Sequence, residues 1–127
     1  MSVRALFDLS GRVALVTGGS RGLGLQMAEA LGEMGARVAL TARKPDELDA
    51  AKAQLARVGI EALPIACDMS DAAAIGRAVE TAVGALGPID ILVNNAGTTP
   101  AETAKFLQDE IAKWGKVIEV AGVKPEA

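Results

Sequence analysis

A run of glycines near the N-terminus is the part of this sequence whose residue types and spacing are best suited to ligand binding. Residues 17–24 read Thr-Gly-Gly-Ser-Arg-Gly-Leu-Gly. Gly18 permits a tight turn, Gly22 lets backbone approach a phosphate, and Gly24 lets a following helix pack closely. The free N–H groups at the start of that helix attract anions. The pattern predicts a pyrophosphate-binding loop, and the expected contacts are Gly18, Ser20, Arg21, Gly22, Leu23 and Gly24.

The segments around this loop have the patterns needed to position it. Residues 12–16 are apolar and β-branched, which predicts a buried parallel strand, and residues 23–34 have helical spacing. Gly35 ends the helix, and residues 37–42 form a second apolar run. The opening is therefore expected to be a strand–helix–strand unit with a right-handed crossover.

The residue that closes the second strand bears on the choice of dinucleotide. An acidic residue there would bind the adenosine ribose and repel a 2′-phosphate, but this chain has Ala42 followed by Arg43. Arg43 and Arg21 are both expected to face the ribose end of the ligand, where a guanidinium can fork onto a phosphate. Together they favour NADP over NAD. The competing interpretation is that each arginine is simply solvated.

The rest of residues 1–98 continues the alternation of helix and strand. A helix over residues 45–58 buries a stripe formed by Leu48, Ala51, Leu55 and Val58. Ser70 is expected to cap a helix over residues 71–86. Strands are expected at residues 62–66 and 89–93. We expect an α/β fold of the Rossmann-like, doubly wound type with a parallel sheet in the order 3-2-1-4, the first two helices on one face and the third on the other.

The glycine pattern combined with two downstream motifs resembles the short-chain dehydrogenase/reductase family. These motifs are Asp68 and the run Asn94-Asn95-Ala96-Gly97, and the resemblance covers residues 7–97, the cofactor-binding half of such an enzyme. The resemblance implies that Asp68 binds the adenine amino group and that Met69 supplies an adjoining backbone contact. It also implies that Asn95, Ala96 and Gly97 line the site near the adenosine ribose, while Asn94 steadies the neighbouring strand. The alternatives are that Asp68 only begins a helix and that the asparagines only form a turn.

The catalytic segment of that family has no counterpart here. Intact members carry an assisting asparagine, a serine and a Tyr-x-x-x-Lys helix, whereas this chain contains no tyrosine. No catalytic residue is therefore assigned.

The sequence of residues 99–127 predicts a C-terminal helix and tail outside the domain formed by residues 1–98. Thr99 is suited to cap it, Pro100 to begin it, and an apolar stripe follows: Leu107, Ile111, Trp114, Ile118 and Ala121. Residues 97–126 resemble the closing helix of the solute-binding receptors of tripartite tricarboxylate transporters. This second resemblance suggests a fusion or chimera joined within residues 97–100. The helix is expected to pack on the domain formed by residues 1–98, and the alternative is that it is swapped onto another subunit.

Composition excludes several other classes of function. A net charge of −3 with scattered basic residues argues against nucleic-acid binding, and no apolar run is long enough for a membrane span. The chain has no histidine and one cysteine, Cys67, so neither a metal site nor an internal disulfide is expected. We expect a cytoplasmic protein in which Cys67 is a small buried residue.

The sequence supports one main function and two alternatives. The main hypothesis is an NADP(H)-binding module without oxidoreductase activity alone. The alternatives are an NADP-dependent carbonyl or 3-oxoacyl reductase completed by a partner chain, and a structural scaffold without ligand. The fourth strand would leave an apolar edge, which predicts a homodimer through that edge, through the C-terminal helix, or both.

Overall fold

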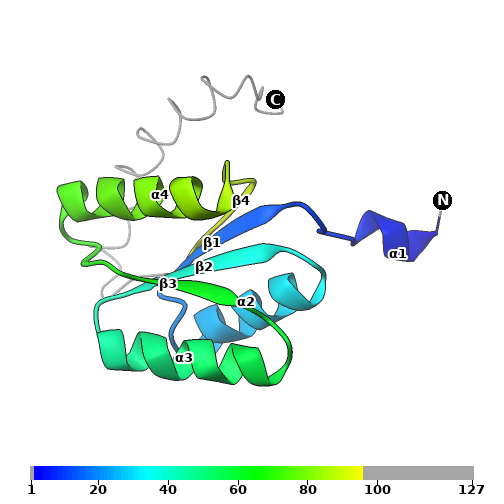
Figure 1. The fold of residues 1–127 in the computed structure, drawn as a ribbon, viewed down its shortest axis with the longest axis horizontal. Helices are drawn as coiled ribbons and strands as arrows, with labels where there is room; N and C mark the ends of the chain where they lie inside the picture. Colours follow the sequence, from blue (N-terminus) through cyan, green and yellow to red (C-terminus); the bar gives the residue numbers. More distant parts are fainter. Residues whose placement is uncertain (1, 96–127) are drawn as a thin grey trace. The chain divides into compact units, whose positions relative to one another are not determined.

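A parallel sheet of four strands forms the centre of the described part of the chain, residues 2–95 of a computed structural model (Figure 1). The strands are β1 (Val13–Thr17), β2 (Arg37–Ala42), β3 (Ala62–Ala66) and β4 (Ile91–Asn94). Their order in the sheet is β3-β2-β1-β4. This confirms the predicted order 3-2-1-4 and the α/β fold class.

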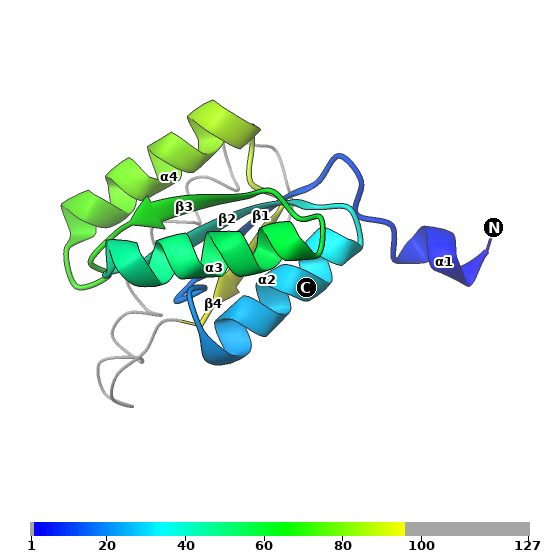
Figure 2. The ribbon, with the colours of Figure 1, turned by 60° about the horizontal axis from the view of Figure 1, so that its bottom comes forward.

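Helices cover both faces of this sheet. The helices on the sheet are α2 (Gly22–Glu33), α3 (Pro45–Arg57) and α4 (Ala72–Leu86), and a short helix, α1 (Val3–Leu6), precedes them. Figures 1 and 2 show α2 and α3 on one face and α4 on the other, as the sequence predicted. The short α1 buries no residue. The predicted C-terminal helix, with Trp114, lies outside the described residues, and no helix within them has the length and apolarity to cross a membrane.

Small apolar side chains build the core between the sheet and its helices. All five residues of β1 are buried, and β1 pairs in register with β2 on one side and β4 on the other. A strand with both faces covered must be apolar throughout, which explains the continuous run that identified β1 in the sequence. The largest fully buried side chains are Leu40, Leu55, Val13, Val16, Val38 and Thr41.

The fourth strand begins two residues later than predicted, at Ile91 rather than residue 89. Asp90 occupies the preceding position, where its carboxylate accepts a hydrogen bond from the Val13 N–H at 2.9 Å. The Asp90 N–H in turn donates to the Val13 carbonyl, also at 2.9 Å, and Arg12 pairs with the carboxylate at 3.7 Å. Asp90 therefore attaches the start of β4 to β1.

Two predicted details at helix ends were wrong. Val58 was expected in the buried stripe of α3 but is 50% exposed, because the helix ends at Arg57 and Ile60 fills the core position instead. Ser70 was expected to cap α4, but the cap is Asp71, whose carboxylate accepts from the N–H groups of Ala73 and Ala74. The Ser70 hydroxyl instead donates to Asp68 at 2.7 Å.

Candidate dinucleotide-binding site

The glycine loop between β1 and α2 has the backbone geometry that its sequence predicted. Gly18 and Gly22 have φ angles of +63° and +58°, in the left-handed region where a side chain is strained. A Cβ built on Gly22 would meet no atom within 4 Å, so its surface is open to a ligand. A Cβ on Gly24 would clash with the Gly18 carbonyl oxygen and lie 2.6 Å from the Asn95 side chain. Gly24 therefore allows α2 to pack against the loop itself.

The open N-terminus of α2 faces the same loop. Arg21 is the N-cap residue and makes no hydrogen bond from its side chain to the helix. Leu23, in the first turn, is 69% exposed. The first N–H groups of a helix carry partial positive charge and need acceptors, so this end of α2 is suited to an anion.

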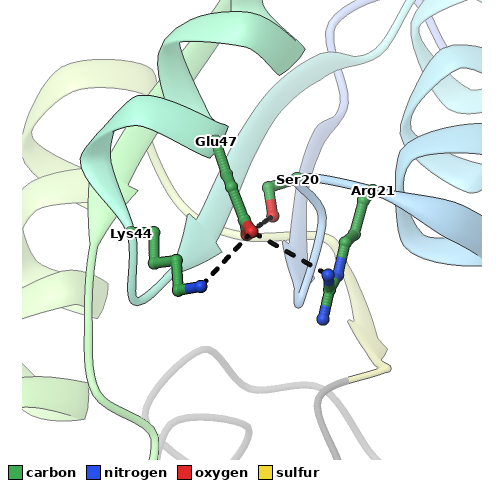
Figure 3. A network of polar contacts seen from close by, with 4 residues as sticks. All are labelled: Ser20, Arg21, Lys44 and Glu47. Carbon is green, nitrogen blue, oxygen red and sulfur yellow. Dashed lines mark hydrogen bonds and ion pairs between the residues drawn. The ribbon is translucent and has the colours of Figure 1, made fainter.

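Four polar side chains, three from loops and one from α3, meet at the glycine loop (Figure 3). Glu47, in the first turn of α3, lies between them. One of its carboxylate oxygens is 3.9 Å from Arg21 and 3.9 Å from Lys44, and the other accepts a hydrogen bond from the Ser20 hydroxyl at 3.4 Å. The sequence analysis assigned neither Lys44 nor Glu47 to the site. The spacing of Lys44 and Glu47, three residues apart at the start of a helix, was the available signal.

Asp68 follows β3 as an exposed, ionised acceptor. Its pKa is lowered mainly by a hydrogen bond from the Ser70 hydroxyl and then by one from the Ser70 N–H. Slight burial raises the pKa, and the positive charge of Arg43 lowers it further. Both hydrogen bonds from Ser70 go to the same carboxylate oxygen of Asp68, which leaves the second oxygen available to a ligand.

Met69 anchors the loop that carries Asp68. Its sulfur accepts contacts from the Thr41 hydroxyl of β2 at 3.8 Å and from the Cys67 thiol at 3.7 Å. Cys67 is buried, as predicted. The side chain of Met69 thus packs towards the end of β2, which leaves its backbone as the part able to reach a ligand.

Asn95 closes the site from the end of β4. Its side-chain amide donates to the Gly18 carbonyl at 3.1 Å, and its N–H donates to the Thr17 hydroxyl at 3.0 Å. The Thr17 hydroxyl also donates to the Val93 carbonyl at 3.3 Å. Asn95 therefore holds the glycine loop through its side chain and the end of β1 through its backbone, while Asn94, to which the sequence analysis gave the role of steadying the neighbouring strand, pairs with Thr17 in the sheet. Ala96 and Gly97 lie outside the described residues.

All these groups follow the carboxyl ends of parallel strands. The glycine loop follows β1, Arg43 and Lys44 follow β2, Asp68 follows β3 and Asn95 follows β4. The carboxyl end of an open α/β sheet is where such folds bind ligands. Within residues 2–95, no group of three or more Cys, Asp or Glu side chains is placed to hold a metal ion. The predicted site residues that the structure describes therefore follow the strands at this one end of the sheet.

A family comparison agrees with this geometry. Residues 12–123 match the model of the short chain dehydrogenase family. The chain belongs to this family. The match runs through residues 97–100, so the family assignment extends across the junction that the sequence analysis expected there.

Individual short-chain dehydrogenases are similar over most of this chain but are much longer. The 2-dehydro-3-deoxy-D-gluconate 5-dehydrogenase of Formosa agariphila is 36% identical over 94% of this chain and 45% of its own length. The gluconate 5-dehydrogenase of Gluconobacter oxydans is 44% identical over 76% of this chain and 38% of its own length. A metagenomic short-chain oxidoreductase, solved in complex with NADP, is 37% identical with a TM-score of 0.77, covering 91% of this chain and 60% of that one. The chain thus spans less than half the length of these two curated relatives.

Proposed function

We propose that this chain is an NADP(H)-binding module of the short-chain dehydrogenase type. The observation that carries the proposal is the charge around the end of β2. Ala42 stands where an acid would select NAD, and it is followed by Arg43 and Lys44. Arg21, from the glycine loop, pairs with the same carboxylate as Lys44, that of Glu47. The similarity to an oxidoreductase solved with NADP adds support.

Each part of the dinucleotide has a corresponding part of the site. The glycine loop and the start of α2 receive the pyrophosphate, with Gly18, Ser20, Gly22, Leu23 and Gly24 around it. The 2′-phosphate lies among the cations, where guanidinium groups give charge-assisted hydrogen bonds. Asp68 and the Met69 backbone receive the adenine, and Asn95, Ala96 and Gly97 the adjoining ribose.

Calorimetric titration with NADP⁺ and NAD⁺ tests this proposal. We expect weak binding with a preference of about tenfold or more for NADP⁺, because a hydrogen bond to a charged group contributes about 1.5–3 kcal/mol. Arg43→Ala should narrow the preference. Arg77→Ala, on α4 at the other face of the sheet, is the matched control and should leave the preference unchanged. Equal or tighter binding of NAD⁺, or no heat with either nucleotide, contradicts the proposal.

The 127-residue chain alone is expected not to reduce carbonyl compounds at a rate typical of an enzyme. It contains neither tyrosine nor histidine, and a positioned general acid contributes about 10²–10⁴-fold to such a reaction. The alternatives, a reductase completed by a partner chain and a scaffold without ligand, differ in their outcomes. Sustained NADPH oxidation with a ketone by the purified chain contradicts the main proposal. Oxidation that occurs only after a partner chain is added favours the partner-completed reductase. Absence of nucleotide binding favours the scaffold.

A further inference from the structure

Glu47 places a carboxylate at the point where the cations beside the glycine loop converge (Figure 3). Arg21 and Ser20 come from the loop after β1, and Lys44 comes from the loop after β2. All three direct a donor group to the two oxygens of Glu47, at 3.9, 3.4 and 3.9 Å respectively. Donors from two separate loops thus surround one anion, and that anion belongs to the protein.

The groups around Glu47 are those that recognise phosphate. Guanidinium, ammonium and hydroxyl donors bind phosphate oxygens by the same charge-assisted hydrogen bonds that they make to a carboxylate. A ligand phosphate placed among these donors would therefore meet the Glu47 charge. Two anions held by the same donors repel one another, and they compete for the same N–H and O–H groups.

The contacts of Glu47 are weak enough to be exchanged. Both ion pairs are close to the longest distance at which such pairs form, and the side chains of Arg21 and Lys44 are 83% and 67% exposed. Ion pairs of this kind contribute little to stability because water screens them. The Glu47 side chain is 30% exposed, so solvent and a ligand can both reach it.

We infer that Glu47 is a resident anion that competes with the ligand's 2′-phosphate for Arg21, Lys44 and Ser20. This inference rests on the proposed NADP(H)-binding function. Glu47 lowers the affinity of the site for NADP⁺. It therefore reduces the preference of the site for NADP⁺ over NAD⁺. An uncharged ribose hydroxyl does not compete with the carboxylate, so NAD⁺ binding is not penalised in the same way. Glu47 is thus a specificity-determining residue that acts against the arginines around it.

Calorimetric titration of Glu47→Gln with NADP⁺ and NAD⁺ tests this inference. Glutamine keeps the size of the side chain and removes its charge. We expect NADP⁺ to bind about three- to tenfold more tightly and the affinity for NAD⁺ to change less than about twofold, the range expected from removing one exposed like charge. Asp46→Asn removes the same charge from the neighbouring position of α3 and is the matched control, for which both affinities should change less than about twofold.

A double-mutant cycle shows whether the competition is for Arg21. In the Glu47→Gln background, Arg21→Ala should reduce NADP⁺ affinity by a larger factor than in the native chain. The reason is that the Arg21 guanidinium then pairs only with the ligand phosphate and no longer with a carboxylate at position 47. Circular dichroism melting curves establish that each variant is folded. An equal factor in both backgrounds overturns the assignment of Arg21 as the contested group.

The inference and the proposed function fail in different ways. If the native chain prefers NADP⁺ but Glu47→Gln binds it equally or more weakly, the competition is wrong, and Glu47 instead holds Arg21 and Lys44 in place for the ligand. If neither the native chain nor the variant binds NADP⁺ more tightly than NAD⁺, the proposed function fails and the inference fails with it. A gain equal to that of Asp46→Asn also overturns the inference, because it shows only the effect of net charge.

Discussion

Gly24 lies against the carbonyl oxygen of Gly18, so that the first turn of α2 rests on the first residue of the loop it follows. A Cβ at position 24 would overlap that oxygen, which is a backbone atom and cannot rotate away. The loop and the helix therefore hold their relative position only while residue 24 is glycine.

Gly24→Ala is expected to destabilise the chain by about 1–3 kcal/mol, the usual cost of forcing an extra methyl group into a packed site. It should also weaken nucleotide binding, because the loop must shift. Gly84→Ala in α4 is the matched control: its Cβ would meet nothing within 4 Å, and alanine in a helix interior should stabilise by about 0.5–1 kcal/mol. Urea denaturation measures both changes, and a destabilisation as large in the control as at Gly24 contradicts this account.

Asp71→Ala is expected to destabilise the chain by about 1 kcal/mol, since it removes the side chain that caps α4. Ser70→Ala provides the comparison, because the Ser70 hydroxyl bonds to Asp68 and not to the helix. We expect its effect to stay within about 0.5 kcal/mol. Chemical denaturation measures the free energy of unfolding of the two variants. A larger loss of stability for Ser70→Ala than for Asp71→Ala would show that the cap is misassigned.

The pKa of Asp68 is expected to lie below its ordinary value of 3.8, because the Ser70 hydroxyl and N–H stabilise the carboxylate. A carboxyl group with a lowered folded pKa contributes stability that is present above the unfolded pKa and lost as pH falls through the folded value. This contribution should therefore disappear only in the acid range below 3.8. At neutral pH Asp68 stays ionised and can accept a hydrogen bond from a ligand.

NMR titration of carboxyl carbons in the native chain and in Ser70→Ala measures this shift. The pKa of Asp68 should rise towards 3.8 when the hydroxyl is removed. Asp8 is an internal control: Ser10 lowers its pKa by the same pair of hydrogen bonds, and Ser70→Ala should leave it unchanged. An unaltered Asp68 titration would show that the hydroxyl is not the main cause.

We expect the chain to form a homodimer through the edge of β4. Within residues 2–95, β4 has a strand neighbour on one side only, and Ile91, Leu92 and Val93 are apolar. Asp90, the charged residue that precedes this strand, accepts a hydrogen bond from Val13 on β1. Two copies could pair their fourth strands antiparallel through the N–H and C=O groups on the side of β4 away from β1.

Leu92→Pro tests the paired edge. Val93 C=O and Asn95 N–H both contact Thr17 on β1, and successive residues along a strand direct these groups to alternate sides, so the Leu92 N–H points away from β1. Proline there should remove a bond of the dimer while leaving β1 and β4 paired. Leu92→Ile, which keeps the N–H, is the control. If light scattering finds that the native chain is a monomer, the dimer is excluded. If the proline variant dimerises normally, the interface is not the edge of β4 and lies elsewhere, for instance in the predicted C-terminal helix.

The strands and their order could be predicted because they depend on local patterns. Buried parallel strands such as β1 are continuously apolar, and the glycine loop marks where the first one ends. The Glu47 cluster could not be predicted, since it joins side chains from loops after different strands whose distance only the folded sheet sets. Helix ends were missed for a related reason: Ser70 and Asp71 are both good caps, and a contact with Asp68 decides between them.

The bond between Asn95 and Gly18 joins residues 77 positions apart in the chain. During synthesis the first three strands can pair as their residues leave the ribosome, because each needs only the strand made just before it. The glycine loop, by contrast, must wait until almost the whole described domain has emerged before β4 can dock beside β1 and Asn95 can hold it. Contacts that close such long loops form late and slowly. The ligand-binding loop, although encoded near the beginning, should therefore be among the last parts of this domain to become ordered.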